Sequence, residues 1–454
     1  MLNYQRRKLL TFVLLLLGAT TISFAQPKIN SPFSRIGVGD LVNPAFSHAR
    51  GMGSLSAAYN DPAHINSVNP ASYSFLQATA FDVGVNIKRT ELSDDQTSQT
   101  LWTGNLDYIS LGFPTKNPKN RAANPIKSPW HWGMNFSFIP YSNVGYQVDQ
   151  TKQIGADTVN FIFRGTGGTF KVHWGNAVRY KNLSVGFNFG YLFGKTTTDQ
   201  LITFQNLESP YFNDFQDEFS IGGVIWNIGT QYRYQFKKMK DGKMAPDGRS
   251  ITFGAYGNSG NGIDFNTSSL YQRVNPSYVN ANQRSRDTIV NVQNNIERGR
   301  LPGQFGVGAY YAKVDKQGFN KFGVGVDFRT TAWSNYSNPT RPNEKLNNAW
   351  RLGIGGNFTP NFGSIKSYWQ KINYQAGFFY GKDPRGFEND LTDYGVTLGL
   401  RLPVIRRNSI PSYINFGLEI GQLKGQSTIN ETYGRLTVGF TLNNNDWFLK
   451  RKFY

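Results

Sequence analysis

The sequence predicts an all-β fold, a 14-stranded antiparallel transmembrane β-barrel, and three observations lead to it. A short alternating pattern recurs from about Thr79 to Leu442, its copies number about fourteen, and a cleavable export signal precedes them. In the clearest copy, residues 81–88 (FDVGVNIK), every second side chain is apolar and those between are Gly, Asn or charged. Successive side chains of a strand point to opposite faces. Repeated copies are therefore typical of a membrane barrel whose lipid-facing and lumen-facing residues alternate.

The first 25 residues have the features of a secretory signal peptide. Residues 6–8 (RRK) form the positive start, residues 9–17 form a short apolar core, and Ala25 ends a small-residue cleavage site. The apolar core is too short to cross a bilayer of about 30 Å as a helix. A buried N-terminal helix is the alternative interpretation.

The composition favours one β-rich unit over several soluble domains. The 454 residues include 48 Gly, and aromatic residues make up 15%. A mean hydropathy of −0.45 excludes a helical membrane protein. It is compatible with a barrel, because the inner face, turns and loops of a barrel are polar. The chain has no Cys, so disulfides, iron–sulfur clusters and thiolate zinc sites are excluded.

The positive charge of the chain points to a membrane surface. The formal net charge is +19, and it falls to about +16 when the three basic residues of the signal peptide are removed. The basic residues lie mostly in expected turns, without a helical basic stripe or a nucleic-acid motif, so no nucleic-acid partner is expected. The outer-membrane lipid and lipopolysaccharide of a Gram-negative cell envelope are the better partners for this charge.

Four segments follow from the pattern. They are the signal peptide 1–25, a turn-rich N-terminal segment 26–78 with one short helix near residues 54–59, the barrel 79–442, and a basic aromatic tail 443–454 on the periplasmic side. The fourteen expected strands are 79–89, 103–113, 130–140, 168–181, 182–195, 218–236, 249–258, 303–314, 319–329, 348–358, 369–380, 391–402, 411–422 and 431–442.

The connections between these strands predict the sidedness of the barrel. If the first strand runs outward, the outer connections, which include 141–167 and 259–302, are mostly longer than the inner ones. Long outer loops and short inner turns are the rule for outer-membrane barrels. The inner connection 114–129 is the exception.

Several charged residues fall on the lumen side of the alternation. A mid-membrane Arg or Lys facing lipid costs about 2–4 kcal/mol, so inward placement is strongly favoured. These residues either pair with one another across strands or form an electrostatic lining that selects solutes. The expected lumen-lining residues are Asp82, Lys88, His131, His173, Asp327, Arg351, Arg401 and Glu419.

Catalytic signals are weak in this sequence. It lacks the G-x-S-x-G, H-E-x-x-H and P-loop motifs, and the Gly-rich stretch 165–168 has no Lys after it. His131 and His173 could form an acid–base or metal-binding pair, but a hydrated lumen lining is the simpler interpretation. The protein is therefore not expected to be an enzyme, and no cofactor or metal is expected.

The N-terminal segment resembles a known family. Residues 49–53 (ARGMG), then AAY at 57–59, DPA at 61–63 and NPA at 69–71, resemble the start of the FadL-like outer-membrane transporters of hydrophobic compounds. The resemblance implies a 14-stranded barrel whose N-terminal segment forms a hatch inside the lumen. The hatch and ligand residues that it implies are Gly51, Met52, Gly53, Leu55, Tyr59, Asn69, Pro70, Ala71 and Phe75.

The resemblance leaves two functions open. One is passive transport of a hydrophobic small molecule, with Ile65 and Val68 as further candidates for a pocket between hatch and wall; plain packing is the alternative for each hatch residue. The other is a non-transporting accessory or docking subunit of an outer-membrane secretion or assembly complex. The chain departs from the family by a Pro-Ala-His-Ile stretch at 62–65 and by its basic aromatic tail, and the latter resembles FadL-like accessory subunits.

Overall fold

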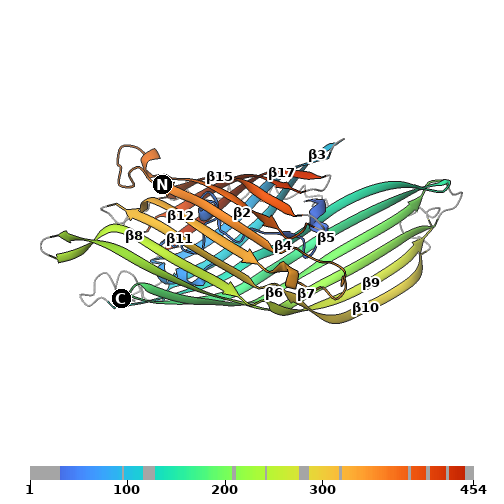
Figure 1. Ribbon diagram of the computed structural model, residues 1–454, viewed down its shortest axis with the longest axis horizontal. Helices are drawn as coiled ribbons and strands as arrows, with labels where there is room; N and C mark the ends of the chain where they lie inside the picture. Colours follow the sequence, from blue (N-terminus) through green and yellow to red (C-terminus); the bar gives the residue numbers. More distant parts are fainter. Residues whose placement is uncertain are drawn as a thin grey trace, which may run out of the picture.

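The computed structural model of the protein is an elongated barrel (Figure 1). The described residues are 31–94, 97–115, 128–206, 211–240, 243–275, 286–315, 320–386, 390–404, 410–425 and 429–444. The predicted signal peptide and residues 445–454 of the predicted tail lie outside them, as does most of the connection 114–129.

The barrel is a closed antiparallel sheet with fourteen crossings, as predicted. The first strand, β2, pairs with the last, β17, from Thr79–Asn444 to Ser93–Asn430, and this pairing closes the cylinder. The strands are β2 (Thr79–Ser93), β3 (Ser98–Pro114), β4 (Trp130–Ile154), β5 (Asp157–Tyr180), β6 (Leu183–Phe204), β7 (Phe212–Lys240), β8 (Lys243–Asn258), β9 (Asn261–Val274), β10 (Arg286–Leu301), β11 (Gln304–Val314), β12 (Asn320–Thr331), β13 (Ala349–Phe358), β14 (Asn373–Asp383), β15 (Leu391–Val404), β16 (Ser412–Lys424) and β17 (Asn430–Asn444).

Two of the fourteen crossings are each broken into two strands. β8 and β9 run in the same direction along β7 and are separated at Ser259 and Gly260, where Gly260 has a φ of +84°. β10 pairs with β9 and β11 pairs with β8, with Pro302 at the break between them. Proline lacks an amide hydrogen and interrupts a ladder. The prediction of a loop over 259–302 was therefore wrong, because most of it is strand.

The barrel also has longer strands than the sequence predicted. The expected outer loop 141–167 is a continuation of β4 and β5, joined by a two-residue turn in which Gly155 has a φ of +64°. Residues 196–217, which separate two of the expected strands, mostly belong to β6 and β7 in the same way. We call the distal parts of β4–β7 together with β9 and β10 the extension; it forms the right-hand part of Figure 1.

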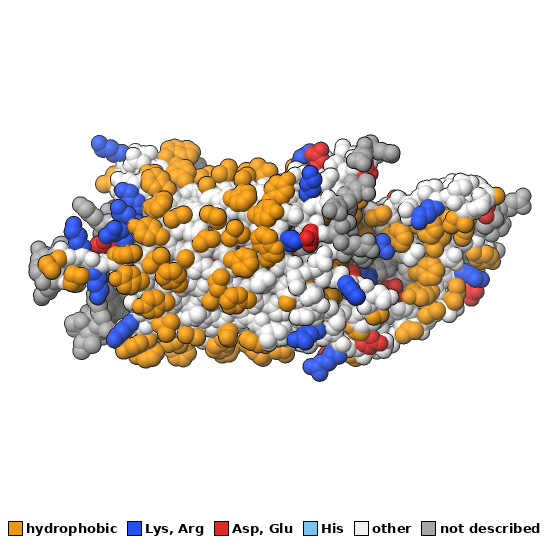
Figure 2. All heavy atoms as spheres, viewed as in Figure 1, with side chains coloured by type: hydrophobic (Ala, Val, Ile, Leu, Met, Phe, Trp, Pro, Cys, Tyr) orange, Lys and Arg blue, Asp and Glu red, His pale blue; other side chains and the backbone are white. Residues whose placement is uncertain are grey.

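The outer face of the barrel carries a broad apolar belt, and single exposed apolar side chains such as Ile289 and Ile296 continue onto the extension. Along β6, residues 183–189 alternate strictly between exposed and buried, whereas residues 196–204 are all half-buried. Crossing a bilayer takes about 9–11 residues of strand, so the 22-residue β6 is long enough to leave it. Figure 2 shows the apolar side chains as a broad band, with charged side chains at its two borders.

Apolar side chains at alternate positions of the expected strands lie in this belt. Trp132, Phe136, Val396, Leu398, Leu436 and Phe440 are among its exposed residues. Alternation along each strand therefore placed the lipid-facing set correctly. None of the helices in the described part of the chain is long and apolar enough to cross a bilayer.

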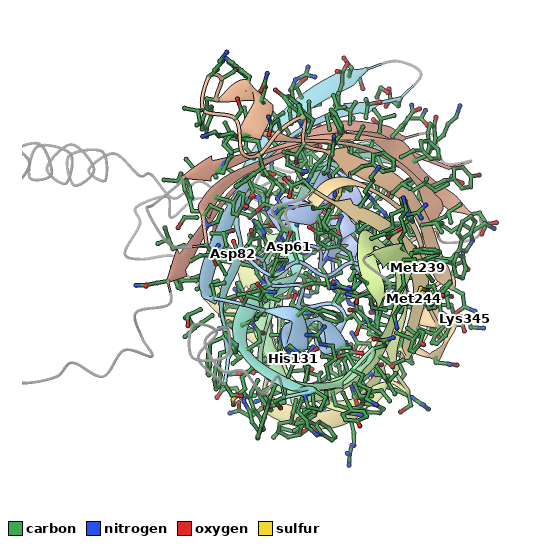
Figure 3. All side chains as sticks on the ribbon, turned by 90° about the vertical axis from the view of Figure 1, so that its left-hand side faces the viewer. Asp61, Asp82, His131, Met239, Met244 and Lys345 are labelled. Carbon is green, nitrogen blue, oxygen red and sulfur yellow. The ribbon has the colours of Figure 1, made fainter. Side chains whose placement is uncertain are left out.

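The N-terminal residues lie inside the barrel, as the view from the end opposite the extension shows (Figure 3). They comprise η2 (Pro32–Arg35), β1 (Asp40–Leu41), which pairs with β4, α2 (Ser47–Arg50) and η3 (Pro70–Phe75). The helix expected near 54–59 was wrong. The helical turn lies earlier, and the left-handed residues Gly53 and Ser54 (φ 66° and 65°) turn the chain after it. We call residues 43–78 the hatch.

The hatch and the inner wall share the hydrophobic core. Phe46 stacks on Tyr108 of β3 with ring centroids 3.7 Å apart, and both belong to a buried cluster with Ile65 and Tyr73 of the hatch. An aromatic pair of this kind contributes about 0.5–1.5 kcal/mol beyond its buried area. The core of this barrel therefore lies in the lumen, between hatch and wall.

Candidate functional site

Inward-facing glycines let the hatch backbone approach the strands closely. A Cβ atom at Gly254 of β8 would overlap the carbonyl oxygen of Ala57, and one at Gly133 of β4 would overlap that of Tyr73. Such close backbone approach is available only where a strand residue has no side chain. These glycines therefore allow the hatch backbone to pack directly against the backbone of the wall along its course.

A buried arginine ties the start of the hatch to the wall. Arg50 in α2 lies 2.7 Å from the Asp107 carboxylate on β3 and donates to the Thr437 hydroxyl on β17 over 3.1 Å. It also donates to the carbonyls of Asn43 and Ala45, each over 2.9 Å. An unpaired buried charge is strongly unfavourable, so this network fixes the helical turn in place.

A second arginine, on the wall, holds the middle of the hatch. Arg401 of β15 donates to the Tyr59 hydroxyl (3.0 Å), the Asp61 carboxylate (2.9 Å) and Nδ1 of His64 (2.8 Å). Nδ1 of His64 also lies 3.1 Å from the Asp61 carboxylate, so Arg401 and Asp61 together hold this imidazole. The ring of His48 lies 4.8 Å from that of His64, and neither of its nitrogens has a hydrogen-bond partner among the described residues.

The burial of these imidazoles makes the hatch sensitive to acid. Burial, and next the Arg401 charge, lowers the pKa of His64 to about 4; burial, and next His64, lowers the pKa of His48. The pKa of His64 in the folded state is below its unfolded value of about 6.5. The free energy of unfolding is therefore undiminished by this group above pH ~6.5, and it falls as the pH decreases toward 4, because the unfolded chain takes up the proton first. The shift in His64 corresponds to about 3 kcal/mol.

We therefore expect the melting temperature in detergent to fall between pH 7 and pH 4.5, and His64→Gln to reduce this fall. The Gln side chain can still accept from Arg401 but cannot be protonated. His131→Gln is the matched control, since His131 lies outside the hatch, and it should keep the wild-type pH dependence. An unchanged slope in His64→Gln would show that other groups control the acid response.

The predicted Asn-Pro-Ala element anchors the end of the hatch. The Asn69 side chain accepts from the Ala71 amide over 3.1 Å, capping η3. It also donates to the carbonyl of Ala57 within the hatch over 2.6 Å and to that of Thr230 on β7 over 3.2 Å. Pro70 occupies the first turn of η3, where its missing amide hydrogen is not needed.

The other predicted hatch residues pack rather than line an open space. Met52, Leu55 and Tyr59 form a buried cluster with Tyr310 of β11. The Phe75 ring lies between two wall guanidinium groups, Arg179 and Arg233, each 4.3 Å from its centroid. Gly51 and Ala71 are also buried.

Some predicted lumen charges bind the hatch. Asp327 accepts hydrogen bonds from the Ser56 and Ala57 amides, and Arg401 binds Asp61. The predicted lumen charges therefore do not all pair with one another across strands, because Asp327 and Arg401 bind hatch residues instead.

The remaining predicted lumen charges pair within the wall. Lys88 contacts Glu431 (2.5 Å), Arg351 contacts Asp393 (3.1 Å) and Glu419 contacts Arg435 (3.3 Å). Asp82 accepts from the Tyr108 hydroxyl over 3.1 Å. The partners Glu431 and Asp393 were missed, because Glu431 lies between the polar residues Asn430 and Thr432 and Asp393 follows Thr392, so alternation gives little signal there.

The two lumen histidines do not form a site together. His173 of β5 is buried and lies opposite Ser137 of β4 in the strand register. His131 is six residues away along β4, opposite Arg179. At about 3.4 Å per residue this is roughly 20 Å, too far for a shared metal or proton.

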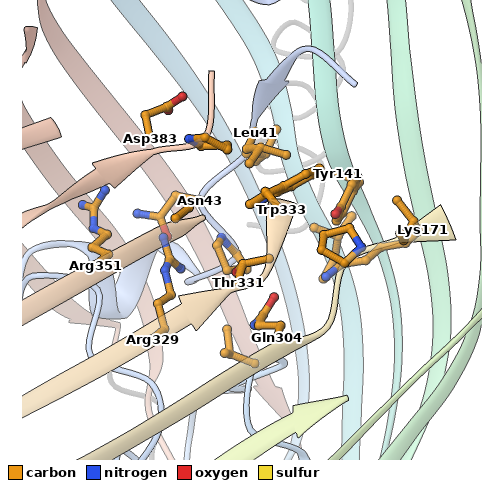
Figure 4. Close-up of a pocket in the computed structure, with 18 of the residues that line it drawn as sticks. Leu41, Asn43, Tyr141, Lys171, Gln304, Arg329, Thr331, Trp333, Arg351 and Asp383 are labelled. Carbon is orange, nitrogen blue, oxygen red and sulfur yellow. The ribbon is translucent and has the colours of Figure 1, made fainter. Parts of the chain in front are cut away.

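A cavity of about 270 Å³ remains between the hatch and the wall at the end that carries the extension (Figure 4). Residues 41–44 and 67–68 line it from the N-terminal side, and of the predicted pocket residues only Val68 is among them. Its lining mixes apolar rings such as Tyr141 and Trp333 with charged groups such as Arg329 and Arg351. The cavity is thus more polar than a pocket for a purely hydrophobic ligand.

Comparisons with solved structures identify the fold. The toluene transporter TbuX of Ralstonia pickettii is 12% identical with a TM-score of 0.52, over 88% of this chain and 98% of that one. CymD, a monoaromatic hydrocarbon channel, is 11% identical with a TM-score of 0.52, over 90% and 99%. The toluene transporter TodX of Pseudomonas putida is 12% identical with a TM-score of 0.51, over 90% and 99%.

Comparisons by sequence identify the family. Among curated proteins no relative matches this chain. A family model named BamG matches residues 6–454, nearly the whole sequence. Together with the shared barrel architecture, this match confirms the expected FadL-like outer-membrane barrel and its location in the outer membrane. The chain therefore belongs to the BamG family.

Proposed function

We propose that this protein is a non-transporting accessory subunit that docks to an outer-membrane protein assembly complex through its extension. The observation that carries this proposal is the regular, unpaired edge that β4 presents beyond the apolar belt. Membership in BamG, an outer-membrane accessory family, supports the same role. Long outer segments on such barrels face the cell exterior, and we place the extension there.

The free edge belongs to the distal half of β4. Residues 142–154 pair with β5 without any register shift. On the side of β4 that faces away from β5, the short strand β1 pairs only with Ser142 and Asn143. The Ser31 amide donates a hydrogen bond to the Gly145 carbonyl on the same side. From residue 147 to 154 no described residue pairs with that side. A flat, unpaired strand edge is a template for adding a strand from another chain.

The opposite edge of the extension, β10, is protected. Its pairing with β9 shifts register twice, near Ile289 and near Asn294, and Asn294 has a positive φ of 55°. Bulges of this kind disrupt the ladder and discourage edge pairing. This asymmetry favours β4 as the docking edge.

The interior of the barrel argues against a transport role. Arg50 and Arg401 each anchor the hatch through a buried ion pair with several further hydrogen bonds. Releasing either would leave a buried charge unpaired, at a cost of about 3–5 kcal/mol. A hatch held this firmly suits a closed structural subunit.

Replacing Thr151 by Pro tests the docking edge. In a two-residue hairpin Ile154 and Asp157 exchange hydrogen bonds, and the pairs alternate from there, so the Thr151 amide points to the free side. Proline there removes a donor from the edge and none from the β4–β5 ladder. We expect the amount of partner protein that is cross-linked at Gln150 to fall about fivefold to tenfold. This is the change in affinity that corresponds to the loss of one hydrogen bond.

The control for this experiment is Thr151→Ser, which keeps the amide hydrogen and the hydroxyl that bonds Asn160. It should cross-link like the wild type. Equal cross-linking in the Pro and Ser variants would show that the edge of β4 is not the docking site.

A second candidate is passive transport of a hydrophobic molecule, which the shared fold with hydrocarbon channels favours. In that case deletion of the gene should slow the uptake of toluene or a related hydrocarbon, and the wild-type gene should restore it. Uptake that does not change on deletion would speak against this candidate.

A further inference from the structure

Two arginines face one another inside the barrel wall. In the register of β12 and β13, Arg329 lies directly opposite Arg351. Like charges directly opposite each other destabilise a sheet, and here both residues line the cavity at the end of the lumen that carries the extension (Figure 4). An arrangement of this kind calls for a negative charge between or beside the two groups.

The protein itself supplies only part of that negative charge. Arg351 donates to Asp393 through Nη1 over 3.1 Å, but its buried Nε and Nη2 have no hydrogen-bond partner among the described residues. Glu419, the next carboxylate, is 3.8 Å from Nη2 and is shared with Arg435. Two nitrogens of the Arg351 guanidinium therefore lack a hydrogen-bond acceptor among the described residues, while the guanidinium itself lies 3.8 Å from the centroid of the Phe379 ring.

Arg329 is less well compensated. No described residue forms a hydrogen bond or an ion pair with its guanidinium, which lines the cavity. Asp327, two residues before it on the same face, is occupied by the Ser56 and Ala57 amides of the hatch. Its positive charge therefore faces the cavity with carboxylates nearby but without a direct ion pair to any described residue.

The rest of the cavity adds to the positive excess. Lys171 of β5, on the other side of the cavity in Figure 4, also has no ion pair with a described residue. The remaining carboxylate in the lining, Asp383, is held by Arg385 over 2.7 Å. The rings of Tyr141 and Trp333 lie between the two positive ends.

We infer that this cavity is a binding site for an oxyanion, a carboxylate or phosphate group held by Arg329 and the free donors of Arg351. Guanidinium groups bind such groups bidentately and strongly in a partly dehydrated site. A volume of about 270 Å³ accommodates a small organic anion or the headgroup of an anionic lipid. The inference does not depend on whether the barrel docks to a partner or transports a solute.

The test uses the purified protein in phosphatidylcholine nanodiscs, titrated with inorganic phosphate at constant ionic strength. Phosphate should raise the melting temperature of the wild type, and Arg329→Gln should weaken the binding about tenfold or more. This variant removes no described contact, so it should fold. In phosphate-free buffer it should melt at or above the wild-type temperature, since a like-charge contact is removed. Lys321→Gln, an exposed position on the same strand, should bind phosphate like the wild type.

A second arm distinguishes a free anion from a lipid headgroup. In nanodiscs that contain phosphatidylglycerol, native mass spectrometry counts the lipid retained by the wild type and by the Arg329→Gln and Lys171→Gln variants. Retention that depends on Arg329 without phosphate binding assigns the site to a headgroup, and phosphate binding that depends on Arg329 assigns it to a free anion. Binding that neither ligand shows, or that Arg329→Gln leaves unchanged, overturns the inference.

Discussion

Replacing Arg401 by Met is expected to release the middle of the hatch while the barrel stays closed. The substitution removes the donors to Tyr59, Asp61 and His64 at once and leaves the Asp61 carboxylate buried without its guanidinium. Breaking one partner of a buried ion pair costs about 3–5 kcal/mol. The strand pairing of β15 with β14 and β16 does not involve this side chain.

Limited trypsin digestion of the folded protein measures this release. The peptide bond after Arg50 lies in the buried hatch, so the wild type should resist cleavage there and the Arg401→Met variant should be cut. Heat-dependent migration in cold detergent gels reports whether the barrel remains closed. Arg89→Met is the control, because Arg89 contacts Glu91 at an exposed position over 3.4 Å, where a pair contributes at most about 1 kcal/mol. Equal protection in both variants would mean that Arg401 does not anchor the hatch.

Replacing Gly254 by Val is expected to push the hatch away from the wall. The new side chain would occupy the space of the Ala57 carbonyl and of the neighbouring Ala58 backbone, neither of which is a flexible side-chain end. Overpacking costs about 1–3 kcal/mol or more where the neighbours cannot move. The Asn69 and Gln231 side chains also bond the Ala57 carbonyl, so its displacement disturbs both.

Conductance in planar bilayers measures the displacement. The wild-type barrel should stay closed, whereas Gly254→Val should show open events as the hatch leaves its seat. Gly434→Val provides a matched control, since a Cβ atom there meets nothing within 4 Å, and it should remain closed. A silent Gly254→Val variant that still forms a barrel would indicate that the hatch tolerates a shift without opening a path.

Alternation predicted the membrane part of the fold well, and its failures have a physical cause. In strands such as β16, exposed apolar residues alternate with buried polar ones because lipid is on one side and a polar lumen on the other. In the extension neither face of the sheet meets lipid, and a stretch such as residues 149–153 (DQTKQ) is polar on both faces. Such a stretch resembles a loop in the sequence because it has no apolar face.

The candidate site was predicted in its parts but not in its connections. The resemblance pointed to the N-terminal segment as a hatch, and the cost of a charge in lipid favoured a lumenal position for Arg401 and Asp327. The contact of Arg401 with Asp61 joins residues 340 positions apart, and a single sequence does not give the register that creates it. The opposition of Arg329 and Arg351 depends on strand register in the same way.

Native mass spectrometry of the protein purified from its own outer membranes in mild detergent tests the central claim most directly. A docking subunit should appear in a complex with at least one outer-membrane partner at fixed stoichiometry, and Thr151→Pro should deplete that complex while the barrel remains folded. A lone monomer from wild-type membranes, together with slower hydrocarbon uptake in a deletion strain, would contradict the claim and favour a transporter.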